Sequence, residues 1–278
     1  MSANQSRTKA TYDLQWNRFR IVRPEEDRAT FLARTGVGPG DLLGKTVLDA
    51  GCGMGRYLRV VSTFNPALLV GIDLSGAVRA AREATQVFGH VQIVQGDLLR
   101  PPFPNQKFDL IYSLGVLDHT PDPKAAFLAL APLVAPGGRI VVWVYEKERG
   151  LLELVKDTQR AITTRLPLPV LVEFSRLMAP VGGLKRRMMA SRVRLIERMG
   201  VALHVLTLGV SMHPDPEVRV CDTLDWYAPR FMSRHTRREV RGWFEEAGLV
   251  EVTDLGADGK FFHEGQGHGV NIIGRRPG

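Results

Sequence analysis

Short apolar runs alternate with segments of helical periodicity between residues 45 and 145, and this alternation restricts the fold more than any other feature of the chain. The apolar runs are nearly continuous, as in strands that are covered on both faces. Strand–helix–strand alternation at this spacing predicts an α/β fold with a doubly wound, mostly parallel sheet. The predicted strands are Lys45–Asp49, Leu68–Asp73, Val91–Gln95, Phe108–Ser113 and Arg139–Tyr145, with two late strands at Val250–Leu255 and Gly269–Gly274.

The segments between and around these strands predict four parts. Residues 1–44 form an N-terminal helical segment, 45–145 the core, 146–220 a helical insertion after the fifth strand, and 221–278 the C-terminal part of the core. In the insertion we expect Pro167, Pro169, Pro180 and the pair Gly182–Gly183 to break the helices. The predicted helices elsewhere are Thr11–Ile21, Pro24–Arg34, Gly76–Phe88, Pro123–Val134 and Thr236–Ala247.

Composition excludes several classes of protein. With 44% hydrophobic and 24% charged residues, the chain is not globally disordered. Two cysteines are too few for a disulfide framework, and no His or Cys pair has metal-ligand spacing, so we expect no metal. The opening MSANQSRTKA has no apolar signal core, and no apolar run approaches the roughly 20 residues of a membrane span. We therefore expect a soluble, cytoplasmic protein.

The strongest local motif is VLDAGCGMGR, in which an apolar run leads through Asp49 into Gly51, Gly53 and Gly55. Glycine allows a tight turn and lets a ligand approach the backbone where a Cβ would clash. Nicotinamide enzymes also carry a glycine loop after their first strand. Arg56, however, stands where the dinucleotide motif requires its third Gly or Ala, which weakens that interpretation.

Acidic residues follow the first three predicted strands. Asp49 precedes the glycine loop, Asp73 closes the second strand, and Asp97 follows the third. Ligands in open α/β sheets bind outside the carboxyl ends of the strands, so the three acids are expected in one crevice. There they suit an amino-acid ammonium, a ribose and an adenine amino group, respectively. Each Asp taken alone could instead be a helix cap.

Together these motifs resemble the class I S-adenosylmethionine-dependent methyltransferases of the bacterial small-molecule type. The resemblance rests on the glycine loop and on four further segments between residues 45 and 145, and it extends more loosely to both ends of the chain. It implies a Rossmann-like seven-stranded sheet and S-adenosyl-L-methionine as cofactor. The further segments are GIDLS, QGDLLRPPF, FDLIYSLGVLDHTPDP and LVAPGG.

The resemblance also implies roles for individual residues. The methionine part of the cofactor would lie at Asp49, Gly51, Gly53 and Gly55, and its ribose at Asp73. The remaining contacts with the cofactor would come from Leu74, Asp97, Leu98, Ser113 and Leu114, with Asp97 and Leu98 at the adenine and the last two beside the sulfur.

Three aromatic side chains have two interpretations each. His119 follows the fourth strand, and imidazole can accept a proton near neutral pH, so it is the candidate catalytic base; it could equally be a structural loop histidine. Tyr12 and Trp16 lie four residues apart on one face of the first predicted helix. Composition alone favours packing for this face, whereas the resemblance favours a lid over the cofactor.

The methyl acceptor is predicted only as a small molecule, with oxygen as the favoured site of methylation. The candidate substrate contacts cluster where the chain leaves the insertion: His213, Asp225, Trp226, Tyr227 and His235. Turn formation explains the HPDPE segment within this region without any function.

The insertion itself has two interpretations. Residues 146–200 carry 12 Lys and Arg against 6 Asp and Glu, between apolar residues at helical spacing. Either the insertion is a helical substrate cap, or it rests as a basic amphipathic surface on anionic lipid and serves a lipid-linked acceptor.

Nucleic acid is disfavoured because no nucleic-acid-binding module is visible. The alternatives to a methyltransferase are a cofactor-binding scaffold without turnover and a nicotinamide-dependent oxidoreductase. The sequence does not predict the oligomeric state.

Overall fold

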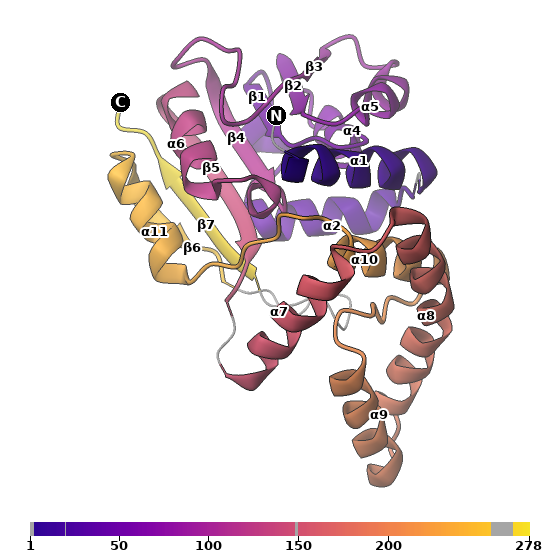
Figure 1. The fold of residues 1–278 in the computed structure, drawn as a ribbon. Coiled ribbons are helices and arrows are strands. Elements are labelled where there is room, and N and C mark those ends of the chain that lie inside the picture. Colours follow the sequence, from indigo (N-terminus) through magenta and orange to yellow (C-terminus); the bar gives the residue numbers. More distant parts are fainter. Residues whose placement is uncertain (1–2, 20, 148–149, 257–268) are drawn as a thin grey trace. The chain divides into compact units, whose positions relative to one another are not determined.

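The computed structural model describes residues 3–19, 21–147, 150–256 and 269–278 (Figure 1). These residues form two compact units. The α/β unit contains the chain up to Lys147 and again from Phe231, and the helical unit lies between these two points. The chain thus returns to the core later than residue 221, because the helix Pro216–Tyr227 packs within the helical unit.

A sheet forms the centre of the α/β unit, as the alternation of apolar runs predicts. Within the described residues it has seven strands in the order β3-β2-β1-β4-β5-β7-β6. The first five are parallel to one another, and β7 runs antiparallel to both β5 and β6. The strands are β1 (Thr46–Ala50), β2 (Leu68–Asp73), β3 (Val91–Gln95), β4 (Phe108–Leu114), β5 (Val134–Tyr145), β6 (Val250–Asp254) and β7 (Gly269–Arg275).

The fifth strand differs most from its prediction. It begins at Val134 instead of Arg139, and Val134 pairs with Phe108 across a register shift in β4. The preceding helix, α6 (Pro123–Leu130), ends four residues earlier than predicted and is followed by the 3-10 turn Ala131–Leu133. Pro132 has no backbone N–H, so it cannot continue the α-helical hydrogen bonding.

Helices form a layer on each side of the sheet (Figure 1). On one side α2 (Pro24–Thr35) packs on α4 (Arg56–Ser62), which packs on α5 (Val78–Thr85). On the other side α6 contacts α11 (Arg237–Glu246). The first helix, α1, covers Ala3–Arg18 and so begins earlier than predicted, and a short helix, α3, covers Pro39–Leu42.

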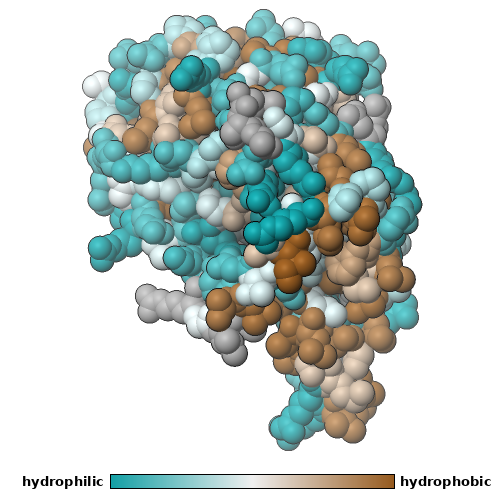
Figure 2. All heavy atoms as spheres, in the orientation of Figure 1, coloured by the Kyte–Doolittle hydropathy of each residue, from teal (hydrophilic) through white to brown (hydrophobic). Residues whose placement is uncertain are grey.

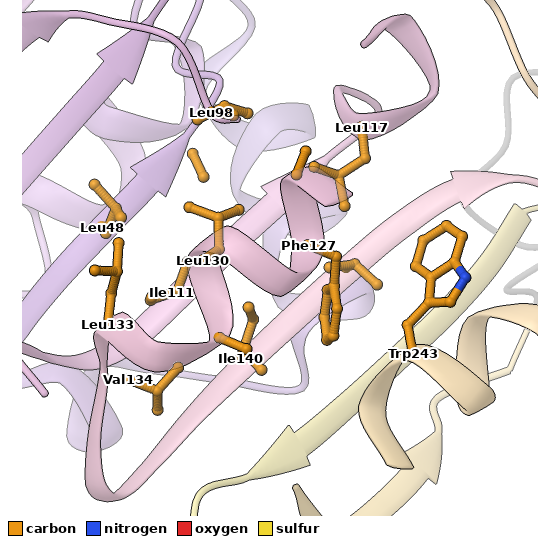
Figure 3. Packing of buried hydrophobic residues seen from close by; sticks show 14 of the residues in the cluster. Leu48, Leu98, Ile111, Leu117, Phe127, Leu130, Leu133, Val134, Ile140 and Trp243 are labelled. Atoms are coloured by element: carbon orange, nitrogen blue, oxygen red, sulfur yellow. The ribbon is translucent and has the colours of Figure 1, made fainter. Parts of the chain in front are cut away.

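The core under α6 and α11 is built on Phe127 (Figure 3). Its ring is fully buried, with its centroid 4.6 Å from that of Phe244 and 6.0 Å from that of Trp243. Both partners belong to α11, which a capping box fixes at its start: Thr236 and Glu239 each bond the other's backbone N–H. Burial of these aromatic rings joins the C-terminal part of the chain to the sheet.

The two places where the chain leaves and re-enters the α/β unit are joined by hydrogen bonds. Glu146, directly after β5, forms a parallel bridge with His235. The His235 N–H donates to the Tyr145 carbonyl at 2.8 Å, and the Lys147 N–H donates to the His235 carbonyl at 3.0 Å. The exit from the sheet and the return to it are therefore fixed beside each other.

The helical unit consists of four helices in the described residues: α7 (Leu151–Thr163), α8 (Leu168–Met189), α9 (Arg194–Leu206) and α10 (Pro216–Tyr227). Here the predicted breaks are partly wrong. Pro167 and Pro169 lie at the start of α8, but the helix continues through Pro180 and Gly182–Gly183. Within the described residues, no helix is long and apolar enough to cross a membrane.

Two basic side chains hold the helical unit together from inside. Lys185 of α8 is fully buried and donates to the carbonyl oxygens of Thr207 at 3.2 Å and Val210 at 2.8 Å. Burial lowers the pKa of Lys185 to about 8. Arg160 of α7 donates to the carbonyl oxygens of Trp226, in the last turn of α10, and of Pro229, just after that helix. These bonds satisfy carbonyls that end helices or lie in loops.

One glycine of the pair inside α8 is required for packing. A Cβ on Gly182 would lie 2.0 Å from the Ser211 carbonyl oxygen. A Cβ on Gly183 would meet only the guanidinium of Arg219, at 3.3 Å. Gly182 thus lets the backbone of the 210–212 segment approach α8 closely, whereas Gly183 faces a movable side chain.

We expect Gly182→Ala to destabilise the helical unit by about 1–3 kcal/mol, because backbone must shift to accept the methyl group. Gly183→Ala is the matched control: it adds the same methyl group and should be neutral or stabilising by up to about 1 kcal/mol. Urea unfolding followed by circular dichroism at 222 nm compares the two variants. Equal stability of both would contradict the packing role of Gly182.

Candidate functional site

The glycine loop after β1 has a backbone that only glycine adopts easily. Gly51, Gly53 and Gly55 have φ values of 101°, 50° and 88°, all in the left-handed region. A Cβ on Gly51 would lie 2.2 Å from Cγ1 of Val116, which follows β4. The loop therefore packs directly against the segment after the fourth strand, and a side chain at Gly51 would separate them.

Asp49 is a buried carboxyl at the end of β1. It is 3% exposed, and its Oδ2 has no hydrogen-bond partner among the described residues. Burial raises the pKa of Asp49 to about 8; the Tyr112 hydroxyl, on the paired residue of β4, opposes this rise. Without a partner, burial of the charged form is costly. A cationic group placed beside Oδ2 would remove that cost.

Asp73 is placed at the end of β2, facing the glycine loop. Its Oδ2 accepts a hydrogen bond from the Gly53 N–H at 2.9 Å, and its Oδ1 accepts from the N–H and hydroxyl of Ser75 at 2.8 and 2.6 Å. Burial raises the pKa of Asp73, while the bonds from Ser75 and Gly53 oppose the rise. Since Oδ1 already accepts two bonds, Oδ2 has the remaining capacity for a ligand hydroxyl.

The other predicted cofactor residues differ in how far their side chains are exposed. Asp97 is partly exposed after β3, and its Oδ1 accepts a bond from the Leu99 N–H at 2.9 Å. The side chain of Leu98 belongs to the hydrophobic core, whereas Leu74 is half-buried. The Leu74 carbonyl accepts a bond from Gln95 at 3.1 Å.

Ser113 and Leu114 end β4, as predicted, but the Ser113 side chain has a structural partner. Its hydroxyl is fully buried and donates to the Ala50 carbonyl at 2.8 Å. This bond joins β4 to β1 beside the glycine loop. Leu114 is 9% exposed. The hydroxyl proton of Ser113 is therefore already used within the sheet.

The first helix brings Tyr12 and Trp16 to the glycine loop. A Cβ on Gly53 would lie 3.5 Å from Nε1 of the Trp16 indole. Tyr12 and Trp16 stack, with ring centroids 6.4 Å apart. The helical spacing of these two residues thus places both on the face of α1 that lies over the loop.

Asp13, between them in the sequence, anchors α1 and has no counterpart in the sequence predictions. Its Oδ1 accepts a hydrogen bond from the Gly76 N–H at 2.5 Å, and its Oδ2 lies 2.6 Å from Lys9 Nζ. Gly76 follows Asp73 on the segment after β2, so Asp13 fixes α1 to the same edge of the sheet as the acids.

His119 lies in the 3-10 turn Leu117–His119 and is 9% exposed. Its Nδ1 is 3.0 Å from the Phe231 carbonyl oxygen, and its ring packs edge-on against Tyr12 and Tyr145, at centroid distances of 5.3 and 6.0 Å. A carbonyl oxygen can only accept, so this contact places the proton on Nδ1 and the lone pair on Nε2.

Asp118 is fully buried beside His119 but has a different task. Its Oδ2 accepts a bond from the Tyr145 N–H at 3.2 Å, and its carbonyl accepts bonds from Ser233. Asp118 thus anchors β5 and the 231–235 segment.

Arg56, which weakened the dinucleotide interpretation, forms an ion pair that the sequence does not reveal. At the first position of α4, its guanidinium donates to the buried Asp27 of α2 and lies 3.9 Å from Glu26. Burial raises the pKa of Asp27, although Arg56 opposes the rise. This ion pair ties the end of the glycine loop to the N-terminal helices.

The predicted acceptor residues are divided between the two units. His213, Asp225, Trp226 and Tyr227 belong to the helical unit, and His235 to the α/β unit. His213 and Tyr227 have partners within the helical unit: His213 Nδ1 accepts the Asp215 N–H at 2.9 Å, and the Tyr227 hydroxyl donates to the Leu208 carbonyl. Trp226 lies under Lys156 Nζ, which is 5.6 Å from its ring centroid.

His235 likewise has structural partners. Its Nε2 is 2.9 Å from the Ser233 hydroxyl, and its ring packs edge-on against Trp243 at 4.9 Å. Burial lowers the pKa of His235. The contacts found within each unit thus explain His213, Tyr227 and His235 without a substrate, and the role of the cluster stays a prediction.

Comparison with known proteins bears on the same part of the chain as the glycine loop and the acids. Residues 48–142 match a family model described as a methyltransferase domain. The α/β unit contains a class I methyltransferase domain. This confirms the family that the glycine loop and the acids resemble, and S-adenosyl-L-methionine is the cofactor of this class.

Curated relatives of the methyltransferase domain act on different acceptors. The chain is 38% identical over 103 residues to a tocopherol O-methyltransferase of Arabidopsis thaliana, covering 35% of this chain and 29% of the relative. It is 35% identical over 103 residues to a ubiquinone biosynthesis O-methyltransferase of Pseudomonas putida, covering 36% and 44%. It is 30% identical over 107 residues to a sterol 24-C-methyltransferase of Gibberella zeae, covering 37% and 28%.

The chain therefore spans less than half the length of these relatives. Among solved structures, an S-adenosylmethionine-dependent methyltransferase from Mesorhizobium loti has a TM-score of 0.51 at 16% identity, covering 90% of this chain and 98% of that one. At this identity the likeness concerns the fold, and it agrees with the predicted Rossmann-like sheet of the methyltransferase domain.

The raised pKa of Asp49 predicts that the cofactor-free protein loses stability as pH rises. The carboxyl has a pKa near 3.8 when unfolded and about 8 when folded, so between these values the folded state holds an extra proton. Stability is then full below about pH 4 and falls by at most about 1.4 kcal/mol per pH unit up to about pH 8. Asp49→Asn should flatten this decline, measured by urea unfolding between pH 5 and 8.

Glu245→Gln, at an exposed position of α11, is the control for loss of a carboxylate. It should leave the slope of the wild-type protein unchanged. An unchanged slope in Asp49→Asn would mean that Asp49 is ionised in the folded protein across this range.

The contact of Trp16 with the glycine loop predicts a role in cofactor affinity. We expect Trp16→Ala to weaken binding of S-adenosylhomocysteine about tenfold, because the indole then no longer shields the loop from water. Leu14→Ala, on the same helix, should leave the affinity within about twofold. Isothermal titration calorimetry measures both dissociation constants, and equal affinities of the two variants would refute a lid formed by Trp16.

Proposed function

We propose that the protein transfers a methyl group from S-adenosyl-L-methionine to a hydroxyl oxygen of a small-molecule acceptor. The observation that supports this most directly is an unbroken line of contacts from the glycine loop to a histidine. Trp16 lies against Gly53, Tyr12 stacks on Trp16, and the ring of His119 packs on Tyr12. A candidate base is thereby held in the same unit, close to the loop that would hold the cofactor.

The residues of the loop fit the proposed cofactor. The buried Oδ2 of Asp49 has no partner among the described residues and suits the ammonium of the methionine part. The rest of the methionine part would lie along the glycine loop, and the remaining capacity of Asp73 Oδ2 suits a ribose hydroxyl. The cofactor supplies a methyl group already activated by the sulfonium.

The chain then has three tasks: it holds the acceptor oxygen in line with the methyl carbon, excludes water, and removes the hydroxyl proton. Positioning can contribute about 7–11 kcal/mol to lowering the barrier. Tyr12 and Trp16 would exclude water from the loop. His119 would accept the acceptor's proton on Nε2 as the new oxygen–carbon bond forms, leaving a methyl ether, S-adenosylhomocysteine and an imidazolium.

The contact between His119 and the Phe231 carbonyl supports this role. It fixes the ring and assigns the proton to Nδ1, so Nε2 is the nitrogen that would take part in proton transfer. Two of the relatives are named as O-methyltransferases, which agrees with oxygen as the acceptor atom. A carbon acceptor, as in the name of the sterol relative, is the second candidate.

The test uses the purified protein with methyl-labelled S-adenosyl-L-methionine and a metabolite extract, with mass spectrometry of the products. We expect a labelled methyl ether. With that product in hand, His119→Asn should lower kcat by about 10²–10⁴ while the dissociation constant of the cofactor changes little, because general-base catalysis contributes about this factor.

Ser233→Ala is the control, because it changes the same group of loops at a residue that bonds the Asp118 carbonyl and the His235 ring instead of His119. Its kcat should stay within about threefold of the wild type. A labelled carbon–methyl product would transfer the proposal to a carbon acceptor. Binding of the cofactor without any labelled product in extracts would favour a scaffold instead.

A further inference from the structure

Exposed apolar side chains are concentrated in the helical unit. Of the sixteen large hydrophobic residues that are exposed among the described residues, thirteen belong to this unit. The other three are Leu43, Val87 and Val250, which are scattered over the α/β unit. Figure 2 shows apolar atoms gathered over α8 and α9. Single exposed apolar residues are ordinary, but a contiguous group of this size marks an interaction surface.

Helix α9 carries the densest part of this surface. Among its thirteen residues only Gly200 is buried, where it packs on Met188 and Met189 of α8. Leu195, Met199 and Leu206 follow one another at helical spacing and are 69%, 54% and 76% exposed. Val201 and Val205 extend this surface around the helix and are 46% and 45% exposed. The helix is therefore apolar and uncovered over one broad arc, opposite the buried Gly200.

Helix α8 continues the apolar surface beside α9, with which it is in contact. Val170, Leu177 and Leu184 recur every seven residues along the helix and are 50%, 69% and 51% exposed. This spacing places the three on one face. We call residues 168–206 the α8–α9 hairpin.

The charge of the α8–α9 hairpin is strongly basic. It contains seven Lys and Arg but only two Asp and Glu. Lys185 is buried, but Arg192, Arg194 and Arg198 are exposed, on α9 and the turn before it, next to Leu195 and Met199 in the sequence. Of the two acids, Glu173 is 2.7 Å from Arg176 in α8. The surface thus combines uncovered apolar side chains with an excess of arginine.

We infer that the α8–α9 hairpin docks on the surface of an anionic phospholipid bilayer. Leucine, methionine and valine side chains enter the boundary between headgroups and acyl chains, and the arginines bind the lipid phosphates. No helix in the described residues can cross a membrane, so the hairpin lies in the interface instead of spanning it. This inference does not depend on the proposed methyl transfer, because it concerns a different surface.

A bilayer fits this surface better than a second copy of the chain does. In a two-fold dimer the same patch meets itself, which would bring the arginines of both hairpins together. Arg194 and Arg198 lie on the same exposed arc of α9 as its apolar side chains. A helix in the headgroup region meets acyl chains and lipid phosphates together along such an arc, and anionic lipid compensates the charge of the arginines.

The test is flotation of the 278-residue chain with vesicles of phosphatidylcholine containing 30% phosphatidylglycerol, and with vesicles of phosphatidylcholine alone. We expect binding to the anionic vesicles and at least about tenfold weaker binding to the neutral ones. The combined variant L195S/M199S/L206S should bind the anionic vesicles at least about tenfold more weakly than the wild type. R192Q/R194Q/R198Q should lose about fivefold per arginine and much of the dependence on salt.

The matched control is L43S/V87S/V250S, which removes the three exposed apolar side chains of the α/β unit. It should bind the anionic vesicles as the wild type does, and circular dichroism verifies that all variants are folded. Failure of the wild type to bind at low salt, or equal loss of binding in both serine variants, would overturn the inference. So would a wild-type dimer in analytical ultracentrifugation that L195S/M199S/L206S dissociates, because the patch would then serve self-association.

Discussion

The α/β unit depends on the close approach of three backbone segments at the carboxyl end of the sheet. The left-handed turn at Gly51 and Gly53 brings the loop after β1 against Val116 after β4. The carboxylate of Asp73, at the end of β2, accepts the Gly53 N–H and holds that turn in place. The same contacts leave Asp49 buried, with an Oδ2 that accepts no hydrogen bond from the part of the chain that the structure describes. Local strain and an uncompensated polar group persist because the surrounding sheet fixes them, as is common where ligands bind.

Local pattern predicted most of this framework. The apolar runs of β2 and β3 have the predicted bounds, and both late strands lie within one residue of theirs. The prediction failed where distant packing outweighs local preference. Gly182 was predicted to break a helix, but it lies inside α8. Its lack of a side chain lets the backbone at Ser211 approach the helix closely. Ser211 lies far from Gly182 in the sequence, so the residues around Gly182 could not reveal this contact.

The candidate site shows the same limit. The glycines and the acids could be placed because each follows a strand, and parallel strands end at one edge of the sheet. The residues that anchor the site could not. Asp13 bonds Gly76 and Asp27 pairs with Arg56 across long stretches of chain, and neither pair has a local motif. A charge within an otherwise amphipathic helix is a weak sign of such an anchor, since most such charges are solvated.

The joint between the two units has an evolutionary consequence. Backbone hydrogen bonds at His235 join the segment that leaves β5 to the segment that enters α11. These bonds do not involve the chain between the two segments. The helical unit, in turn, has internal ties of its own at Lys185 and Arg160. A stretch of chain with this arrangement can be shortened, extended or replaced while the glycine loop keeps its geometry. Proteins that share the α/β unit could thus acquire new acceptors or new locations in the cell by exchanging the helical unit alone.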